Sequence, residues 1–262
     1  MTSLRIQGGG QCHAVFKIRH PDKLNLLCFP FAGGSADFYN RWSSPSLNDT
    51  VVHPIRLPGR GQLINLPLIS NMPLLIDLII NELYRFRDCR FALLGTSMGG
   101  WLALQLAQEL KRRESLLQPE CLVICSTAHP AFRKHLPQIE NIDPSTAIRR
   151  LGEFNPSCLV TLKNPELASL FLPILQADFT LCRTWQFNSN VGVNCPIWAF
   201  HAHDDHIVDY SMMLPWKNLT CGAFQMTRVD GDHFFTEHPS PAFLEQLHHL
   251  LHVTQRQPLL LP

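Results

Sequence analysis

Short apolar runs alternate with amphipathic segments along the first half of the chain. Residues 24–29, 51–57 and 90–94 have the length and apolar content of strands buried in a sheet. Between the last two runs, residues 74–86 carry apolar side chains at helical spacing. Alternating strands and helices predict a mainly parallel sheet with helices on both faces. Pro54 puts the second strand near a sheet edge, because proline cannot donate to a ladder.

The alternation stops after a strand predicted at residues 121–126. Residues 129–194 contain six prolines and short helical patterns, but no convincing strand pattern. The sheet pattern then resumes at residues 196–202 and 224–229, and a helix at residues 240–253 closes the fold. The second half therefore predicts the rest of an α/β sheet, interrupted by a helical insertion.

We interpret residues 129–194 as a helical lid inserted into a single domain of residues 1–262. Two short helical patterns, residues 166–171 and 174–183, lie on either side of Pro173. A lid excludes water from a site and shapes its pocket. A separate helical domain is the alternative, but the segment is short for one and is divided by prolines.

A glycine-rich turn at residues 95–100 connects the third predicted strand to a helical pattern at residues 101–110. Its sequence, Gly-Thr-Ser-Met-Gly-Gly, matches the G-x-S-x-G nucleophile elbow, whose glycines omit Cβ atoms that would clash in so tight a turn. Such a turn presents the Ser97 hydroxyl as a nucleophile and directs the backbone N–H of Met98 toward an oxyanion. An incidental serine in a plain turn is the alternative, since the motif alone is common.

A serine nucleophile needs a general base, and that base needs a carboxylate to orient it. In α/β-hydrolases these residues follow the serine in the order Asp or Glu, then His. His233 follows the last predicted strand and is the candidate base. Asp205 follows the preceding strand and is the candidate carboxylate. We prefer it to the neighbouring Asp204 because Val208, three residues on, can anchor the loop in the core.

The first predicted strand ends in the turn Pro-Phe-Ala-Gly-Gly-Ser at residues 30–35. Hydrolases of this type place a second oxyanion donor in such a turn. The backbone N–H of Ala32 is the candidate donor, and that of Phe31 is the neighbouring alternative. The turn by itself would favour a purely structural role, and its functional interpretation depends on the elbow.

Two further groups of residues are expected to be structural. Phe38, Tyr39 and Trp42 lie at helical spacing and are predicted to form a stripe in the core. Arg56 and Arg60 flank the turn after the second strand. We expect them to form ion pairs, and binding of a phosphate is the alternative.

Residues 201–206 present a competing chemistry. Their sequence, His-Ala-His-Asp-Asp-His, matches the H-x-H-x-D-H zinc motif of metallo-β-lactamase-fold hydrolases. That fold carries the motif in its first half and needs further ligands well downstream, whereas little chain follows it here. A zinc site would also leave the Ser97 turn and His233 unexplained, so we expect no metal.

Composition limits the partners. The formal net charge of +1 gives no basic surplus for nucleic acid. No apolar run is long enough to cross a bilayer, and residues 1–16 lack the apolar core of a signal peptide. Nine cysteines without a CxxC pair favour reduced thiols. We expect a cytoplasmic monomer without nucleic-acid or membrane partners.

In this order the motifs resemble the type II thioesterases of nonribosomal peptide and polyketide synthases, within the α/β-hydrolase superfamily. The resemblance runs from about residue 24 to about residue 251 and rests chiefly on residues 29–35, 56–60, 95–100, 177–179 and 231–235. It implies an editing enzyme that removes acyl or aminoacyl groups stalled on the phosphopantetheine arm of carrier proteins. It also implies an acyl-serine intermediate and no bound cofactor.

Two positions depart from this resemblance, and several functions stay open. The residue before the nucleophile is usually His and is Thr96 here, and a usual Gly is Ala202. A medium-chain thioesterase of fatty acid synthesis is the nearest alternative function. A small-molecule esterase and a catalytically silent binding protein are the others, although an intact Ser, Asp and His set speaks against the last.

Overall fold

A six-stranded parallel sheet forms the centre of the protein. The computed structural model describes residues 20–42 and 47–256. The strands are β1 (Leu24–Phe29), β2 (Thr50–Pro54), β3 (Phe91–Thr96), β4 (Leu122–Cys125), β5 (Ile197–Ala202) and β6 (Phe224–Val229). Their order is β2-β1-β3-β4-β5-β6, and all neighbouring strands are parallel. The prediction of a parallel sheet with the Pro54 strand at its edge is confirmed.

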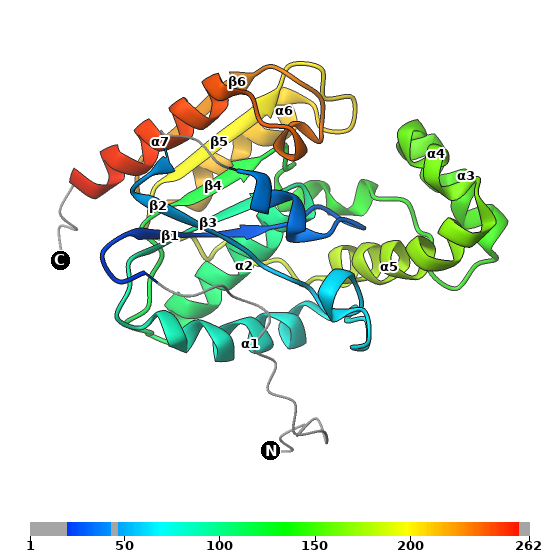
Figure 1. Ribbon diagram of the computed structural model, residues 1–262, viewed down its shortest axis with the longest axis horizontal. Helices are drawn as coiled ribbons and strands as arrows, with labels where there is room; N and C mark the ends of the chain where they lie inside the picture. The colour runs from blue at the N-terminus through cyan, green and yellow to red at the C-terminus, as the bar shows by residue number, and fades with distance from the viewer. Residues whose placement is uncertain (1–19, 43–46, 257–262) are drawn as a thin grey trace.

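Helices occupy the connections between the strands and follow the last strand, β6 (Figure 1). Those outside the β4–β5 connection are α1 (Met72–Leu83), α2 (Met98–Arg112), α6 (Tyr210–Met213) and α7 (Pro241–Arg256), with 3-10 turns η1 (Ala36–Arg41), η3 (Gly61–Leu63), η4 (Tyr84–Phe86), η7 (Leu214–Leu219) and η8 (Phe235–Glu237). The β4–β5 connection forms η5 (Pro130–His135), α3 (Pro144–Phe154), η6 (Pro156–Cys158), α4 (Leu159–Leu162) and α5 (Pro165–Thr184), and it adds no strand to the sheet.

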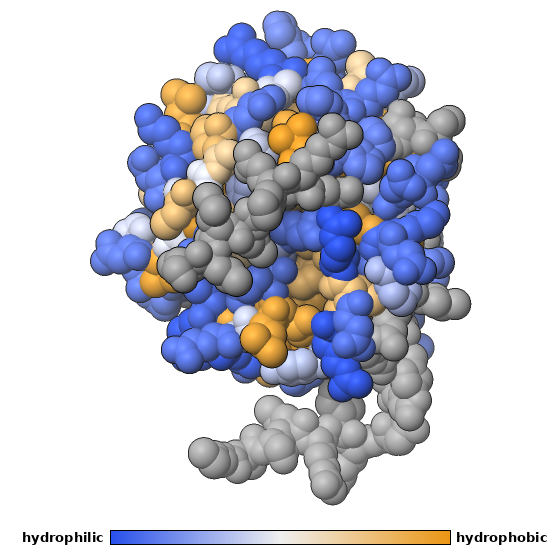
Figure 2. Space-filling view, turned by 90° about the vertical axis from the view of Figure 1, so that its left-hand side faces the viewer, coloured by the Kyte–Doolittle hydropathy of each residue, from blue (hydrophilic) through white to orange (hydrophobic). Residues whose placement is uncertain are grey.

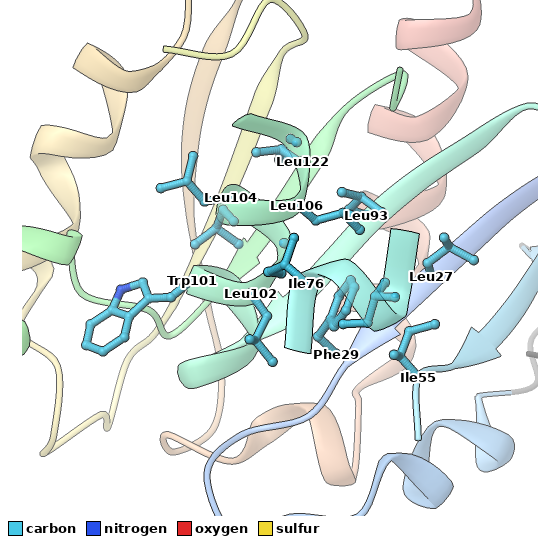
Figure 3. Packing of buried hydrophobic residues seen from close by; sticks show 14 of the residues in the cluster. Leu27, Phe29, Ile55, Ile76, Leu93, Trp101, Leu102, Leu104, Leu106 and Leu122 are labelled. Atoms are coloured by element: carbon cyan, nitrogen blue, oxygen red, sulfur yellow. The ribbon is translucent and has the colours of Figure 1, made fainter. Parts of the chain in front are cut away.

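Side chains of the central strands alternate between the two faces of the sheet, and helices cover both. Leu27 and Phe29 of β1 pack in one apolar cluster with α1 and α2, as Figure 3 shows. The intervening residues Leu26 and Cys28 pack in a second cluster with η1 and α7. Because successive side chains are buried on opposite faces of the sheet, most positions of such a strand are apolar, and the strand appears as a nearly continuous apolar run in the sequence.

Polar caps fix where two of the flanking helices begin. Asn71 Oδ1 accepts a hydrogen bond from the backbone N–H of Leu74 at 2.9 Å at the start of α1. Ser240 Oγ accepts from the N–H of Phe243 at 3.2 Å at the start of α7. Each cap satisfies an N–H group that has no partner within its own helix.

The lid differs in one respect from the expected short helices. Residues 166–171 and 174–183 belong to the single helix α5, which continues through Pro173. Proline removes one helical hydrogen bond, but the helix also buries apolar side chains on both sides of it, including Leu172 and Phe179. Packing of this face therefore outweighs the local helix-breaking tendency.

The lid has its own small apolar core, which includes Ile139, Leu151, Leu162 and Phe179. In Figure 1, α3 and α4 project beyond the sheet on the side opposite the α7 C-terminus. On the face turned away from the lid, the side chains in view are mainly hydrophilic, with small groups of hydrophobic ones between them (Figure 2). No helix in the described ranges is long and apolar enough to cross a membrane.

Candidate active site

Ser97 occupies the turn between β3 and α2 in a strained backbone conformation. Its φ of 53° and ψ of −119° are rare for a residue with a side chain, and such strain is concentrated at functional sites. A Cβ added at Gly95 would lie 2.1 Å from backbone atoms of Gly99, so the tight turn requires glycine there. The Ser97 N–H donates to Cys125 O at 2.9 Å, and Thr127 Oγ1 donates to Ser97 O at 3.0 Å. The structure thus forms the elbow that the sequence predicts.

A buried hydrogen-bonded pair joins the two loops after β5 and β6. His233 Nδ1 lies 2.9 Å from Asp205 Oδ2 and 3.0 Å from Asp205 Oδ1, and the two side chains are 5% and 0% exposed. Asp205 Oδ1 also accepts the backbone N–H groups of Ile207 and Val208, each at 2.9 Å. By contrast, Asp204 pairs with the exposed His203. The structure therefore brings Asp205, and not its neighbour, to His233.

Several opposing effects act on the Asp205 carboxyl. Burial alone would raise its pKa, because a charged group loses solvation in the interior. The hydrogen bond and charge of His233, together with the N–H groups of Val208 and Ile207, outweigh burial and hold the pKa below its ordinary value. Asp205 is therefore ionised at neutral pH and available to stabilise a positive imidazolium.

Ser97 and His233 line one cavity of about 530 Å³. Ala32 and Met98 line it as well, so all the predicted site residues except Asp205 border the same space. The lid supplies much of the apolar wall, including Phe132, Leu136, Leu151, Phe154, Phe171 and Leu175. A mainly apolar pocket next to a nucleophile suits the hydrocarbon part of an acyl group.

The loop that carries Ala32 is held in a defined turn. Gly34 N–H donates to Phe31 O at 3.0 Å, and Gly33 has a φ of 79°, the positive value that the third position of a type II turn requires. The Gly33 N–H donates to Asp178 Oδ2 at 2.7 Å and is therefore already engaged. Met98 begins α2, whose first N–H groups lack helical partners. The predicted oxyanion donors thus border the cavity.

A buried ion pair connects this loop region to the lid, and its partner residue was not predicted. Arg60 Nη1 and Nη2 donate to Asp178 Oδ2 and Oδ1 at 2.6 and 2.7 Å, with side chains 6% and 2% exposed. Arg56 pairs with Asp37 at 3.0 Å. The expectation that both arginines form ion pairs is confirmed. The Arg60 partner is 118 residues away in α5, a distance that no local sequence pattern spans.

We expect Asp178→Ala to lower the free energy of unfolding by about 3–5 kcal/mol, the usual cost of removing one partner from a buried ion pair. The buried guanidinium of Arg60 would lose its counter-charge, and the N–H of Gly33 would lose its acceptor. Urea unfolding followed by tryptophan fluorescence measures the change.

Glu153→Ala is the matched control, because it removes a lid carboxylate whose pair with Arg149 is more than half exposed. Its expected cost is at most about 1 kcal/mol. Equal destabilisation by the two substitutions would contradict the role given to the Arg60–Asp178 pair.

The residues of the alternative zinc motif are directed to different partners. His201 Nε2 lies 2.8 Å from Val208 O in the interior, and His203 meets Asp204 at the surface. Asp205 is engaged by His233. Within the described part of the chain, no three His, Cys, Asp or Glu side chains come together in a metal-binding group. The motif therefore does not correspond to a clustered ligand set in this fold.

A parallel sheet, a strained serine elbow, a late His–Asp pair and a helical lid define a hydrolase of the α/β-hydrolase fold. The chain belongs to the thioesterase domain family, whose sequence model matches residues 24–251. It is thus a hydrolase that acts on thioesters. This agrees with the resemblance that the motifs indicated.

Relatives from several biosynthetic settings share most of the chain. Gramicidin S biosynthesis protein GrsT of Aneurinibacillus migulanus is 30% identical over 81% of this chain and 83% of its own length. The medium-chain S-acyl fatty acid synthase thioesterase of Rattus norvegicus is 27% identical over 84% and 85%. The structure of RedJ, a thioesterase of the prodiginine pathway in Streptomyces coelicolor, superimposes with a TM-score of 0.74 and 27% identity over 88% and 86%.

Proposed function

We propose that this chain is a type II thioesterase that hydrolyses acyl or aminoacyl groups from the phosphopantetheine arms of carrier proteins. It would regenerate stalled carriers of a nonribosomal peptide or polyketide synthase. The observation that carries the proposal is the opening of Ser97 and the Asp205-paired His233 onto one apolar cavity beneath a lid. The similarity to GrsT and RedJ supports the choice of pathway.

In the first half of the proposed reaction, the enzyme takes the acyl group from the carrier. Ser97 Oγ attacks the thioester carbonyl while His233 accepts the hydroxyl proton. The N–H groups of Met98 and Ala32 stabilise the oxyanion. The carbon–sulfur bond then breaks, His233 returns the proton to the departing pantetheine sulfur, and an acyl-Ser97 ester remains.

In the second half, water replaces the pantetheine thiol. His233 takes a proton from water as it attacks the ester, and it returns that proton to Ser97 when the acid leaves. Asp205 holds the imidazole tautomer and stabilises its cation throughout. Every bond change is supplied by these side chains and water, so the proposal needs no metal and no bound cofactor.

Release of medium-chain fatty acids is the second candidate function. Two observations favour it: the similarity to the rat medium-chain enzyme and the apolar wall of the 530 Å³ cavity. Both functions use carrier-bound thioesters, so both predict carrier proteins as partners. Under both, the chain is proposed to be a cytoplasmic monomer. They differ in the length of the acyl group that is removed fastest.

Intact-protein mass spectrometry of acyl-loaded carrier proteins tests the proposal. The purified chain is incubated with carriers bearing acetyl, aminoacyl, octanoyl and longer groups, and with a p-nitrophenyl ester. Fastest release of short or aminoacyl groups supports editing, whereas fastest release of medium chains supports the second function. Cleavage of the p-nitrophenyl ester alone would replace both with a small-molecule esterase.

A further inference from the structure

Three buried hydroxyl groups form a connected network beneath the candidate nucleophile. Thr96 Oγ1 lies 2.9 Å from the phenolic oxygen of Tyr39 and 3.0 Å from Thr236 Oγ1. All three residues are 0% exposed. Thr96 immediately precedes Ser97, and it is the position where this chain departs from the histidine usual in the family.

Each outer member of the network holds a different part of the site. The Tyr39 hydroxyl donates to Phe29 O at 3.0 Å, at the end of β1 where the Ala32 loop begins. Thr236 follows His233 by three residues, and its backbone carbonyl accepts from Trp42 Nε1 at 2.8 Å. The network therefore touches the oxyanion loop, the elbow strand and the histidine loop.

The surroundings make these hydrogen bonds hard to replace. Thr96 is the last residue of β3, and its hydroxyl meets Tyr39 of the apolar cluster that also contains Trp42, Phe235 and Phe243. A hydroxyl group that loses its partner at such a buried position is left unsatisfied, which costs free energy. Burial also raises the pKa of Tyr39 well above its usual value, so its hydroxyl stays protonated and can donate.

The rings around Tyr39 restrict movement of the network. Its ring centroid lies 4.0 Å from that of Phe38 and 5.0 Å from that of Trp42. Threonine itself is restricted at χ1 because it is branched at Cβ. Packed side chains thus fix the positions of the hydroxyl groups. The loops that are hydrogen-bonded to them are therefore held in fixed positions relative to one another.

We propose that Thr96 is a positioning residue. Through Tyr39 and Thr236, it holds the Ser97 elbow, the Ala32 loop and the His233 loop in the relative positions that the reaction needs. The inference rests on the proposed function, in which Ser97 and His233 carry out catalysis. An error of about 1 Å in such an arrangement can cost roughly a hundredfold in rate. The network acts on the reaction although none of its hydroxyls lines the cavity.

Thr96→Val tests the proposal, with Thr96→Ser as the conservative variant. Two rates are measured: modification of Ser97 by a fluorophosphonate, and turnover of an acyl carrier protein with separate kcat and KM. Thr96→Val is expected to slow both the modification and kcat roughly ten- to a hundredfold with KM within about twofold. Thr96→Ser, which keeps the hydroxyl, is expected to retain most of the wild-type rate.

Thr50→Val is the matched control. Thr50 is also a buried strand threonine, but it lies on the edge strand β2, its hydroxyl has no hydrogen-bond partner among the described residues, and it does not line the cavity. We expect its rates to equal those of the wild type. A similar loss in Thr50→Val and Thr96→Val would overturn the inference.

A double-mutant cycle separates a network from independent contacts. If the hydroxyls act as a unit, Thr96→Val with Thr236→Val is expected to be hardly slower than the slower single variant. If the rate losses of the two single variants multiply in the double variant, or if Thr96→Val reacts like the wild type, this inference is overturned and the proposed function is not. A wild type that does not react with the fluorophosphonate would overturn the proposed function as well. If Thr96→Val does not fold, Tyr39→Phe and Thr236→Val provide the same comparison.

Discussion

Replacing Ser97 with alanine is expected to lower the rate of thioester hydrolysis by about six orders of magnitude. The substitution removes only the hydroxyl, so the elbow and the cavity keep their shape. His233 then has no serine hydroxyl to activate, and water must attack the thioester directly, without a covalent intermediate. The residual rate would come from binding and from the oxyanion donors.

Intact-protein mass spectrometry measures this loss directly, because it separates acylated carrier protein from free carrier protein. Ser169→Ala serves as the control, since Ser169 is an exposed lid residue whose hydroxyl donates to Glu166 O. A parallel reaction contains a chelator. If hydrolysis survives Ser97→Ala and disappears with the chelator, the proposed serine mechanism is wrong. The catalytic site would then be a metal site at residues 201–206.

The centre of the sheet could be predicted from the sequence because its strands are buried on both faces. β1 and β3 are fully buried, and such strands appear as continuous apolar runs. The elbow could be predicted for a different reason: its glycines are required by the close approach of Gly95 and Gly99. Both signals are local, so a single sequence contains them.

The pairing of Asp205 with His233 was predicted from chain order and from the Val208 anchor, without a distance. The structure supplies the distance, because parallel β5 and β6 end side by side and bring their following loops together. Prediction succeeded here because strand order and loop position follow from the same topology.

Long-range polar contacts could not be predicted. Thr96 meets Tyr39 and Thr236 across 57 and 140 residues of sequence, and nothing in the local pattern distinguishes it from an ordinary strand threonine. Asp178 belongs to the motif that carried the resemblance, but its partner Arg60 became evident only from the fold. Such contacts depend on how the lid and loops pack against the sheet.

Asp205→Asn is expected to lower kcat by about four orders of magnitude, on the precedent of the same change in a serine-protease triad. An amide in place of the carboxylate cannot stabilise the imidazolium, and its NH₂ group favours the wrong tautomer of His233. The amide oxygen can still accept from Ile207 and Val208, as Oδ1 does now, so the loop is expected to remain folded.

Asp204→Asn distinguishes this chemical effect from a general disturbance of the loop. Asp204 is the adjacent residue, but its carboxylate is 66% exposed and pairs with the exposed His203, so its replacement is expected to leave kcat within about twofold of wild type. Steady-state kinetics and thermal unfolding are compared for both variants. A loss below tenfold in Asp205→Asn, or equal losses in the two variants, would remove Asp205 from the mechanism. A large loss confined to Asp205→Asn, with little change in melting temperature, would show that its charge serves the reaction and not the fold.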